Sequence, residues 1–86
     1  MYLHLGQNTV VNKSSIIGIF DLDGTTISAK TRKFLTESEK RGQVFNVSEE
    51  LPKSFVLCEE NGKITVYISQ MSSGTLLKRS GGLGIG

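Results

Sequence analysis

Two aspartates follow directly on an apolar run in the first third of the chain. Residues 16–20 read Ile-Ile-Gly-Ile-Phe, and Asp21 and Asp23 come next, ahead of Gly24. Residues two apart on an extended chain project to the same side. A carboxylate can serve as a nucleophile, and carboxylates can hold a catalytic metal ion. The spacing therefore raises the hypothesis of metal-assisted catalysis at Asp21 and Asp23.

The stretch from Ile16 to Thr26 resembles the first motif of the haloacid dehalogenase superfamily. The resemblance implies a nucleophile at Asp21, an acid and base at Asp23, and bound magnesium. That family also needs a later Ser or Thr, a distant Lys and a second acidic pair on a doubly wound sheet. The 60 residues after Thr26 are too few for such a sheet. We therefore favour a strand end and a turn, for which Asp and Gly are preferred. The alternative is magnesium-dependent phosphoryl transfer at Asp21 and Asp23. It predicts a phosphatase activity that the substitution Asp21→Asn abolishes.

The elements that must position these side chains are short. Alternation over residues 2–5 and a β-rich run at 9–11 flank Gly6-Gln7-Asn8, which predicts a hairpin. Residues 16–20 predict a strand covered on both faces, and this run is the best candidate for the central strand. The sequence after it predicts a helix that begins beyond Ser28 and ends near Arg41.

The predicted helix has an exposed basic side. Phe34 and Leu35 lie on its apolar face, and five basic residues outnumber two acidic ones around it: Lys30, Arg32, Lys33, Lys40 and Arg41 against Glu37 and Glu39. Basic residues in a first turn oppose the helix dipole and cost stability. They suggest a partner, although a solvated face that keeps the protein in solution explains them as well.

The second half predicts strands, a loop and a short helix. Residues 44–47 form a strand and 48–52 a loop, and 55–58 pair with 64–68 across Glu59-Glu60-Asn61-Gly62-Lys63, in which Asn-Gly favours a hairpin. Ser72 and Ser73 precede a short helix over 75–79. The sequence thus predicts an α+β fold: a single domain over 1–79 of mostly antiparallel short strands, one central helix and a short C-terminal helix, with a flexible Gly-rich tail over 80–86.

Composition narrows the class of protein. The 86 residues are 37% hydrophobic and 21% charged with a net charge of +2, which is typical of one small folded domain rather than a disordered chain or a membrane span. No export signal is visible, so we expect a cytoplasmic protein. The single cysteine, Cys58, lies in an apolar run and is expected to be a buried structural residue. We expect no metal site and no cofactor.

Four segments carry a resemblance that covers nearly the whole chain. They are Met-Tyr-Leu-His-Leu-Gly at 1–6, Ile-Ile-Gly-Ile-Phe-Asp at 16–21, Leu-Pro-Lys-Ser-Phe-Val at 51–56 and Ser-Gly-Thr-Leu-Leu-Lys-Arg at 73–79. In order and spacing they resemble the RemB branch of the RemA/RemB extracellular matrix regulatory family. The RemA branch carries an arginine-rich stretch near position 50, where this chain has Glu50-Leu51-Pro52-Lys53, and an arginine near position 15, where it has Ser15.

The resemblance implies a transcriptional regulator of matrix genes in biofilm formation. RemA-type members form rings that bind DNA, with a LytTR-like fold, so the resemblance implies a homo-oligomer on double-stranded DNA. Weak basic patches gain affinity when several copies engage one duplex. The candidate contacts to DNA phosphates are Lys13, Lys30, Arg32, Lys33, Lys53, Lys78 and Arg79. The alternative is a protein-interaction module that works through a RemA-like partner, with apolar surface at Phe34, Leu51 or Met71.

Overall fold

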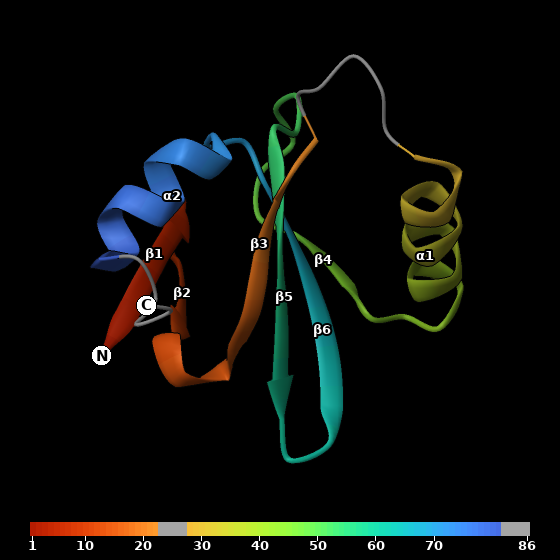
Figure 1. Ribbon diagram of the computed structural model, residues 1–86, viewed down its shortest axis with the longest axis horizontal. Helices are drawn as coiled ribbons and strands as arrows, with labels where there is room; N and C mark the ends of the chain where they lie inside the picture. Colours follow the sequence, from red (N-terminus) through yellow and green to blue (C-terminus); the bar gives the residue numbers. More distant parts are fainter. Residues whose placement is uncertain (23–27, 82–86) are drawn as a thin grey trace.

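A four-stranded sheet with strand order β3-β5-β6-β4 forms the centre of the molecule (Figure 1). The computed structural model describes residues 1–22 and 28–81. The elements in chain order are β1 (Tyr2–Gly6), β2 (Thr9–Asn12), a 3₁₀ turn (Lys13–Ser15), β3 (Ile16–Asp21), α1 (Ala29–Lys40), β4 (Val44–Asn46), β5 (Ser54–Glu60), β6 (Lys63–Ser69) and α2 (Ser73–Ser80). The predicted α+β class is confirmed.

The two predicted hairpins are both present. β1 pairs antiparallel with β2, and β5 pairs antiparallel with β6 along their whole lengths, from Ser54 opposite Ser69 to Glu60 opposite Lys63. Asn61 and Gly62 have φ of 52° and 79°, the left-handed backbone that a two-residue hairpin turn requires. The turn is therefore tighter than the sequence indicated, because Glu59, Glu60 and Lys63 belong to the strands.

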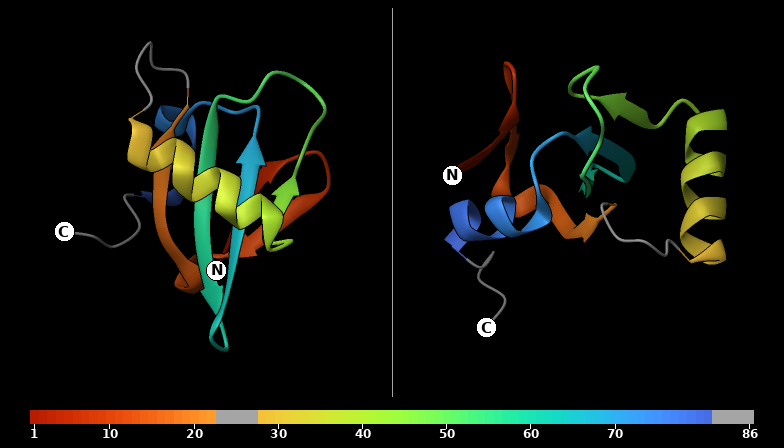
Figure 2. Two further views of the ribbon diagram at one scale, coloured as in Figure 1. Left: turned by 90° about the vertical axis from the view of Figure 1, so that its right-hand side faces the viewer. Right: turned by 90° about the horizontal axis from the view of Figure 1, so that it is seen from above.

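The sheet lies between two unlike layers (Figure 2). The β1–β2 hairpin and α2 cover one face, and α1 crosses the other. The hairpin side holds the main buried cluster: Leu3, Leu5, Val11, Val47, Val56, Cys58 and Leu76. Buried serines join the layers, since the Ser69 hydroxyl donates to the Leu5 carbonyl and the Ser54 hydroxyl to that of Met71, each at 2.7 Å. These bonds satisfy polar groups that burial would otherwise leave unpaired.

The prediction that residues 16–20 form the central strand is wrong. β3 is an edge strand that pairs only with β5, and the central strands are β5 and β6. Ile17 occupies a bulge in that pairing and is 50% exposed. Ile19 packs against the hairpin-side core, while Phe20 stacks on Phe55 on the α1 side with ring centroids 4.8 Å apart. The predicted cover on both faces is also wrong, because none of the six residues of β3 is fully buried. An apolar run therefore does not say where in the sheet a strand lies.

The helices begin and end close to the predicted residues. The Ser28 hydroxyl accepts from the Thr31 amide and the Ser72 hydroxyl from the Thr75 amide, each at 3.1 Å, so both serines are N-caps. α1 ends at the Arg41 cap, whereas α2 runs through Ser80, one residue past the predicted domain end. The predicted tail lies mostly outside the described residues.

α1 is the least buried of the layers. Ser38 is its only fully buried residue, and Phe34 reaches the sheet through a tilted contact with Phe55 at 6.3 Å between ring centroids. Along the described parts of the chain, no helix has both the length and the apolar character needed to cross a membrane.

Candidate nucleic-acid interface

Three of the predicted DNA contacts lie together on the first half of α1. Lys30, Arg32 and Lys33 are all exposed, and the first turn of α1 contains no acidic residue. None of the three side chains forms a hydrogen bond or an ion pair with another described residue. Because the helix dipole also places partial positive charge at this end, the first half of α1 is an electropositive surface.

Lys53 lies at the same end of the sheet. Its backbone accepts from the Leu22 amide at 2.8 Å and donates to the Ser69 carbonyl at 2.9 Å, so it is held where β3 ends and β5 begins. Its side chain is exposed. The Phe34–Phe55 contact brings the first half of α1 over the start of β5. The structure therefore brings Lys53 toward the α1 cations, although 20 residues separate it from Lys33 in the sequence.

The remaining three predicted contacts lie on the hairpin side. Lys13 is half-buried in the 3₁₀ turn after β2, and its amide donates to the Met1 carbonyl at 2.9 Å. Lys78 and Arg79 are exposed in the last turn of α2, where cations interact favourably with the negative end of the helix dipole. We call these residues the α2-side group, and Lys30, Arg32, Lys33 and Lys53 the α1-side group.

The two groups do not form one surface within a single chain. α1 and α2 lie on opposite sides of the sheet (Figure 1), so a straight duplex against one helix does not reach the other. The seven cations are therefore divided between the two sides of the sheet. The α1-side group brings a cation from the loop before β5 to the same end of the sheet as three cations of α1.

The alternative catalytic residues lie in a different kind of fold. Asp21 is exposed at the end of β3, opposite Ser54 of the antiparallel neighbour β5. That setting is an edge strand of a mostly antiparallel sheet and not a doubly wound parallel sheet. Asp23 lies outside the described residues. Within residues 1–22 and 28–81, no three His, Cys, Asp or Glu side chains gather as a metal site would require.

Cys58 is a buried thiol, as predicted. It is 4% exposed, and burial, followed by the negative charge of Glu60, raises its pKa to about 11. A thiol with so high a pKa is a poor nucleophile near neutral pH. Its place in the hairpin-side core is therefore structural.

The apolar surface predicted for a protein partner is partly present. Leu51 is 78% exposed in the loop before β5, and Phe34 is 38% exposed on α1. Met71 is different, because it is half-buried and packs against the hairpin-side core. The prediction of exposed apolar surface at Met71 is therefore wrong.

Comparison with known proteins identifies the family. Residues 2–79 match the model of a family described as RemA-like, extracellular matrix regulatory protein A-like, and this match runs from β1 into α2. The chain belongs to the RemA-like family. It is 39% identical over 80 residues to Extracellular matrix regulatory protein B of Bacillus subtilis (strain 168), covering 93% of this chain and 90% of that protein. The resemblance to the RemB branch is thereby confirmed.

Membership of the RemA-like family places the site in a regulatory protein. The family description and the relative's name both refer to regulation of extracellular matrix, and neither refers to a reaction. The matched range contains all seven predicted cations, from Lys13 to Arg79.

Proposed function

We propose that this chain is a non-enzymatic, cytoplasmic transcriptional regulator of extracellular matrix genes in biofilm formation that contacts double-stranded DNA as a homo-oligomer. The observation that carries the proposal is the α1-side group. Its cations are exposed and form no ion pairs with described residues, and three of them oppose the dipole of their own helix. A helix that keeps an unfavourable charge arrangement gains from a polyanionic partner.

Assembly supplies the affinity that one copy lacks. The net charge of the chain is only +2. Several copies arranged around an axis would present the α1-side group repeatedly along one duplex, and each further contact forms at high effective concentration. The α2-side group then lies on the other side of each subunit, away from that duplex. The LytTR-like fold that the resemblance implied belongs to this proposal.

Titration of a duplex against salt tests the proposal. Each phosphate contact contributes about −0.9 to the slope of log affinity against log salt concentration. We expect the triple variant Lys30→Gln, Arg32→Gln, Lys33→Gln to lose most of the affinity and to make the slope shallower by about 2 to 3 for each copy that contacts the duplex. Fluorescence anisotropy of a labelled duplex measures both.

The matched control lies at the other end of α1. Lys40→Gln with Arg41→Gln removes two exposed cations from the same helix and should leave the slope almost unchanged. An equal loss in both variants would indicate a non-specific charge effect. Wild-type protein that fails to bind in dilute buffer would reject direct DNA contact.

A second candidate function rests on Leu51. A side chain that is 78% exposed beside Pro52 is a possible anchor for another protein, such as a RemA-like partner. Co-purification lost on Leu51→Ser, with no duplex binding by the wild type, would favour this function.

A further inference from the structure

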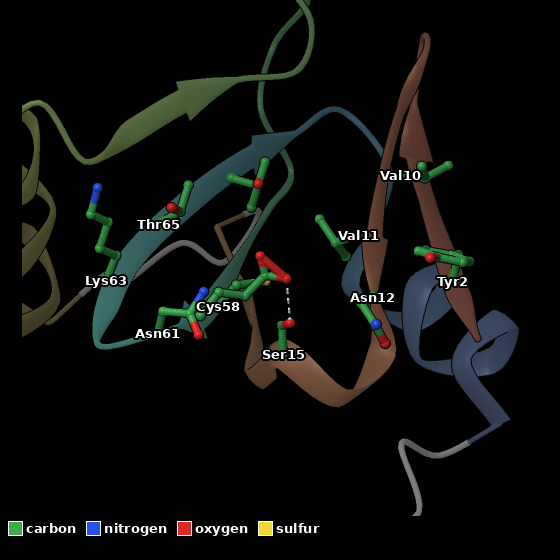
Figure 3. A pocket seen from close by; sticks show the side chains of 11 residues that line it. Tyr2, Val10, Val11, Asn12, Ser15, Cys58, Asn61, Lys63 and Thr65 are labelled. Atoms are coloured by element: carbon green, nitrogen blue, oxygen red, sulfur yellow. Dashed lines mark hydrogen bonds between the residues drawn. The ribbon is translucent and has the colours of Figure 1, made fainter.

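A groove unrelated to the basic groups opens on the hairpin side of the sheet (Figure 3). The hairpin and α2 cover β3 and β5, whereas the same face of β6 lies beside a cavity of about 620 Å³. One wall comes from the hairpin, with Tyr2, Val10 and Val11, and the other from β6, with Thr65 and Tyr67. This volume is typical of pockets for small molecules.

Apolar and aromatic side chains lie in both walls of the groove, among polar ones. Val10 is 54% exposed although it is a branched hydrophobic residue. A smaller cavity of about 360 Å³ shares Val10, Thr65 and Tyr67 and continues the groove to Phe45. Phe45 meets Tyr67 edge to face, with ring centroids 5.6 Å apart. Exposed apolar and aromatic walls favour an apolar ligand body, and aromatic faces also attract cations.

A carboxylate lies at the polar end of the groove. The Ser15 hydroxyl donates to Glu60 Oε1 at 2.8 Å, which joins the turn before β3 to the end of β5 (Figure 3). Lys63 is opposite Glu60 in the strand register, but its side chain extends away from Ser15 and forms no ion pair with a described residue. The Glu60 carboxylate therefore lies beside the groove without a direct ion pair to Lys63, which lines the same cavity.

The charge of Glu60 reaches into the groove. After burial, it is the next cause that raises the pKa of Cys58, and it also contributes to the raised pKa of Tyr67. Both residues line the groove. Two separate groups thus experience a negative potential there, which favours positive charge in a ligand.

We propose that this groove binds a small organic cation: an ammonium group on an aromatic or branched alkyl body. The body lies between Val10 and Tyr67, and the ammonium group donates to the Glu60 carboxylate. The site uses none of the seven basic residues and is independent of DNA contact. It would allow a metabolite of this class to bind the regulator on the side of the sheet opposite α1.

Three probes that share a phenylethyl body and differ in charge test the proposal. The full chain is titrated with 2-phenylethylamine, 2-phenylethanol and 3-phenylpropionate, and backbone amide shifts are followed by NMR. We expect shifts centred on Val10 and Thr65, with affinity for the amine about fivefold above that for the alcohol, because the cation gains one solvent-exposed ion pair. The carboxylate should bind most weakly.

Substitutions at neighbouring glutamates provide the matched comparison. Glu60→Gln keeps an acceptor for Ser15 and should abolish the preference for the amine, whereas Glu59→Gln, on the opposite face of β5, should leave it intact. Val10→Lys places a cation at the exposed groove wall and should weaken amine binding about fivefold or more. The proposal is overturned if the alcohol or the carboxylate binds as tightly as the amine, if Glu60→Gln behaves as wild type, or if the shifts follow only a change in oligomeric mass.

Discussion

Gly18 is the residue at which the β3 backbone and an aromatic ring meet most closely. A Cβ atom built on Gly18 would lie 2.8 Å from the ring of Phe20, closer than real Cβ atoms approach other heavy atoms. The ring is in this position because it stacks on Phe55. Glycine at position 18 therefore leaves the space that the ring of Phe20 occupies beside the β3 backbone.

Gly18→Ala should displace Phe20 and cost about 1 kcal/mol of unfolding free energy, the value of a lost aromatic pair. Urea unfolding measures the loss. Gly74→Ala is the control, since nothing lies within 4 Å of its added carbon and alanine favours the α2 helix. In a Phe20→Leu background the cost of Gly18→Ala should shrink. An unchanged cost there would show that the ring is not the cause.

Cys58 makes the fold sensitive to alkaline pH. Its pKa is raised from 9.0 to about 11, so the unfolded state loses the thiol proton at a lower pH than the folded state does. The stability contribution is complete below pH 9 and is lost as the pH rises toward 11. Chemical denaturation at pH 8, 9, 10 and 11 should show a decline that is reduced in Cys58→Ala, which has no thiol. Tyr67 adds to the decline in the same direction. An equal decline in the variant would contradict this origin.

At the scale of the elements, α1 carries its charges in the unfavourable direction. Its first half holds only basic charges, and its two acidic residues, Glu37 and Glu39, lie in its second half, whereas Lys40 in the last turn is favourably placed. Each misplaced surface charge costs roughly 0.3–1 kcal/mol at low salt. Stability alone would select the reverse arrangement at the helix start, which is consistent with the proposed contact between α1 and DNA.

Lys30→Glu with Arg32→Glu should therefore raise stability and weaken duplex binding together. We expect a gain of roughly 0.5–2 kcal/mol at low salt from the two sites, measured by thermal unfolding. The same variant should lose most of its affinity for DNA. A gain in stability without loss of duplex binding would separate the helix from the DNA interface, and a loss of stability would show that the charges support the fold.

The whole molecule has a thin core and apolar side chains left on its surface. Tyr2, Ile17, Phe45 and Leu51 are all at least 49% exposed, on several elements. A domain of this size buries a limited share of its surface, so the proposed assembly would add stability by covering some of these side chains. It would also repeat the α1-side group, which a single chain presents only once.

We expect a mass in solution well above the 9.4 kDa of one chain. Light scattering or sedimentation measures it across a dilution series, and duplex affinity should fall in the range where the assembly dissociates. A chain that stays monomeric at high concentration while binding DNA with full affinity would contradict the role of assembly.

The sequence by itself determined the local structure. Ser28 and Ser72 identified both helix starts, and Asn61-Gly62 identified the tightest hairpin, because capping and turn chemistry depend on near neighbours in the chain. The regulatory family was also readable from four short segments. These signals depend on near neighbours or on the order of segments along the chain, and neither needs a tertiary structure.

Only the tertiary structure decided the rest. The strand order put β3 at the edge of the sheet with no fully buried residue, and the apolar run at residues 16–20 indicated neither. The separation of Lys30 from Lys78 depends on which face of the sheet each helix covers. The bond between Ser15 and Glu60 joins residues 45 apart, and no local pattern marks either of them. Distances between elements result from the packing of the whole chain. The placement of the basic residues and the shape of the groove could therefore be seen only in the fold.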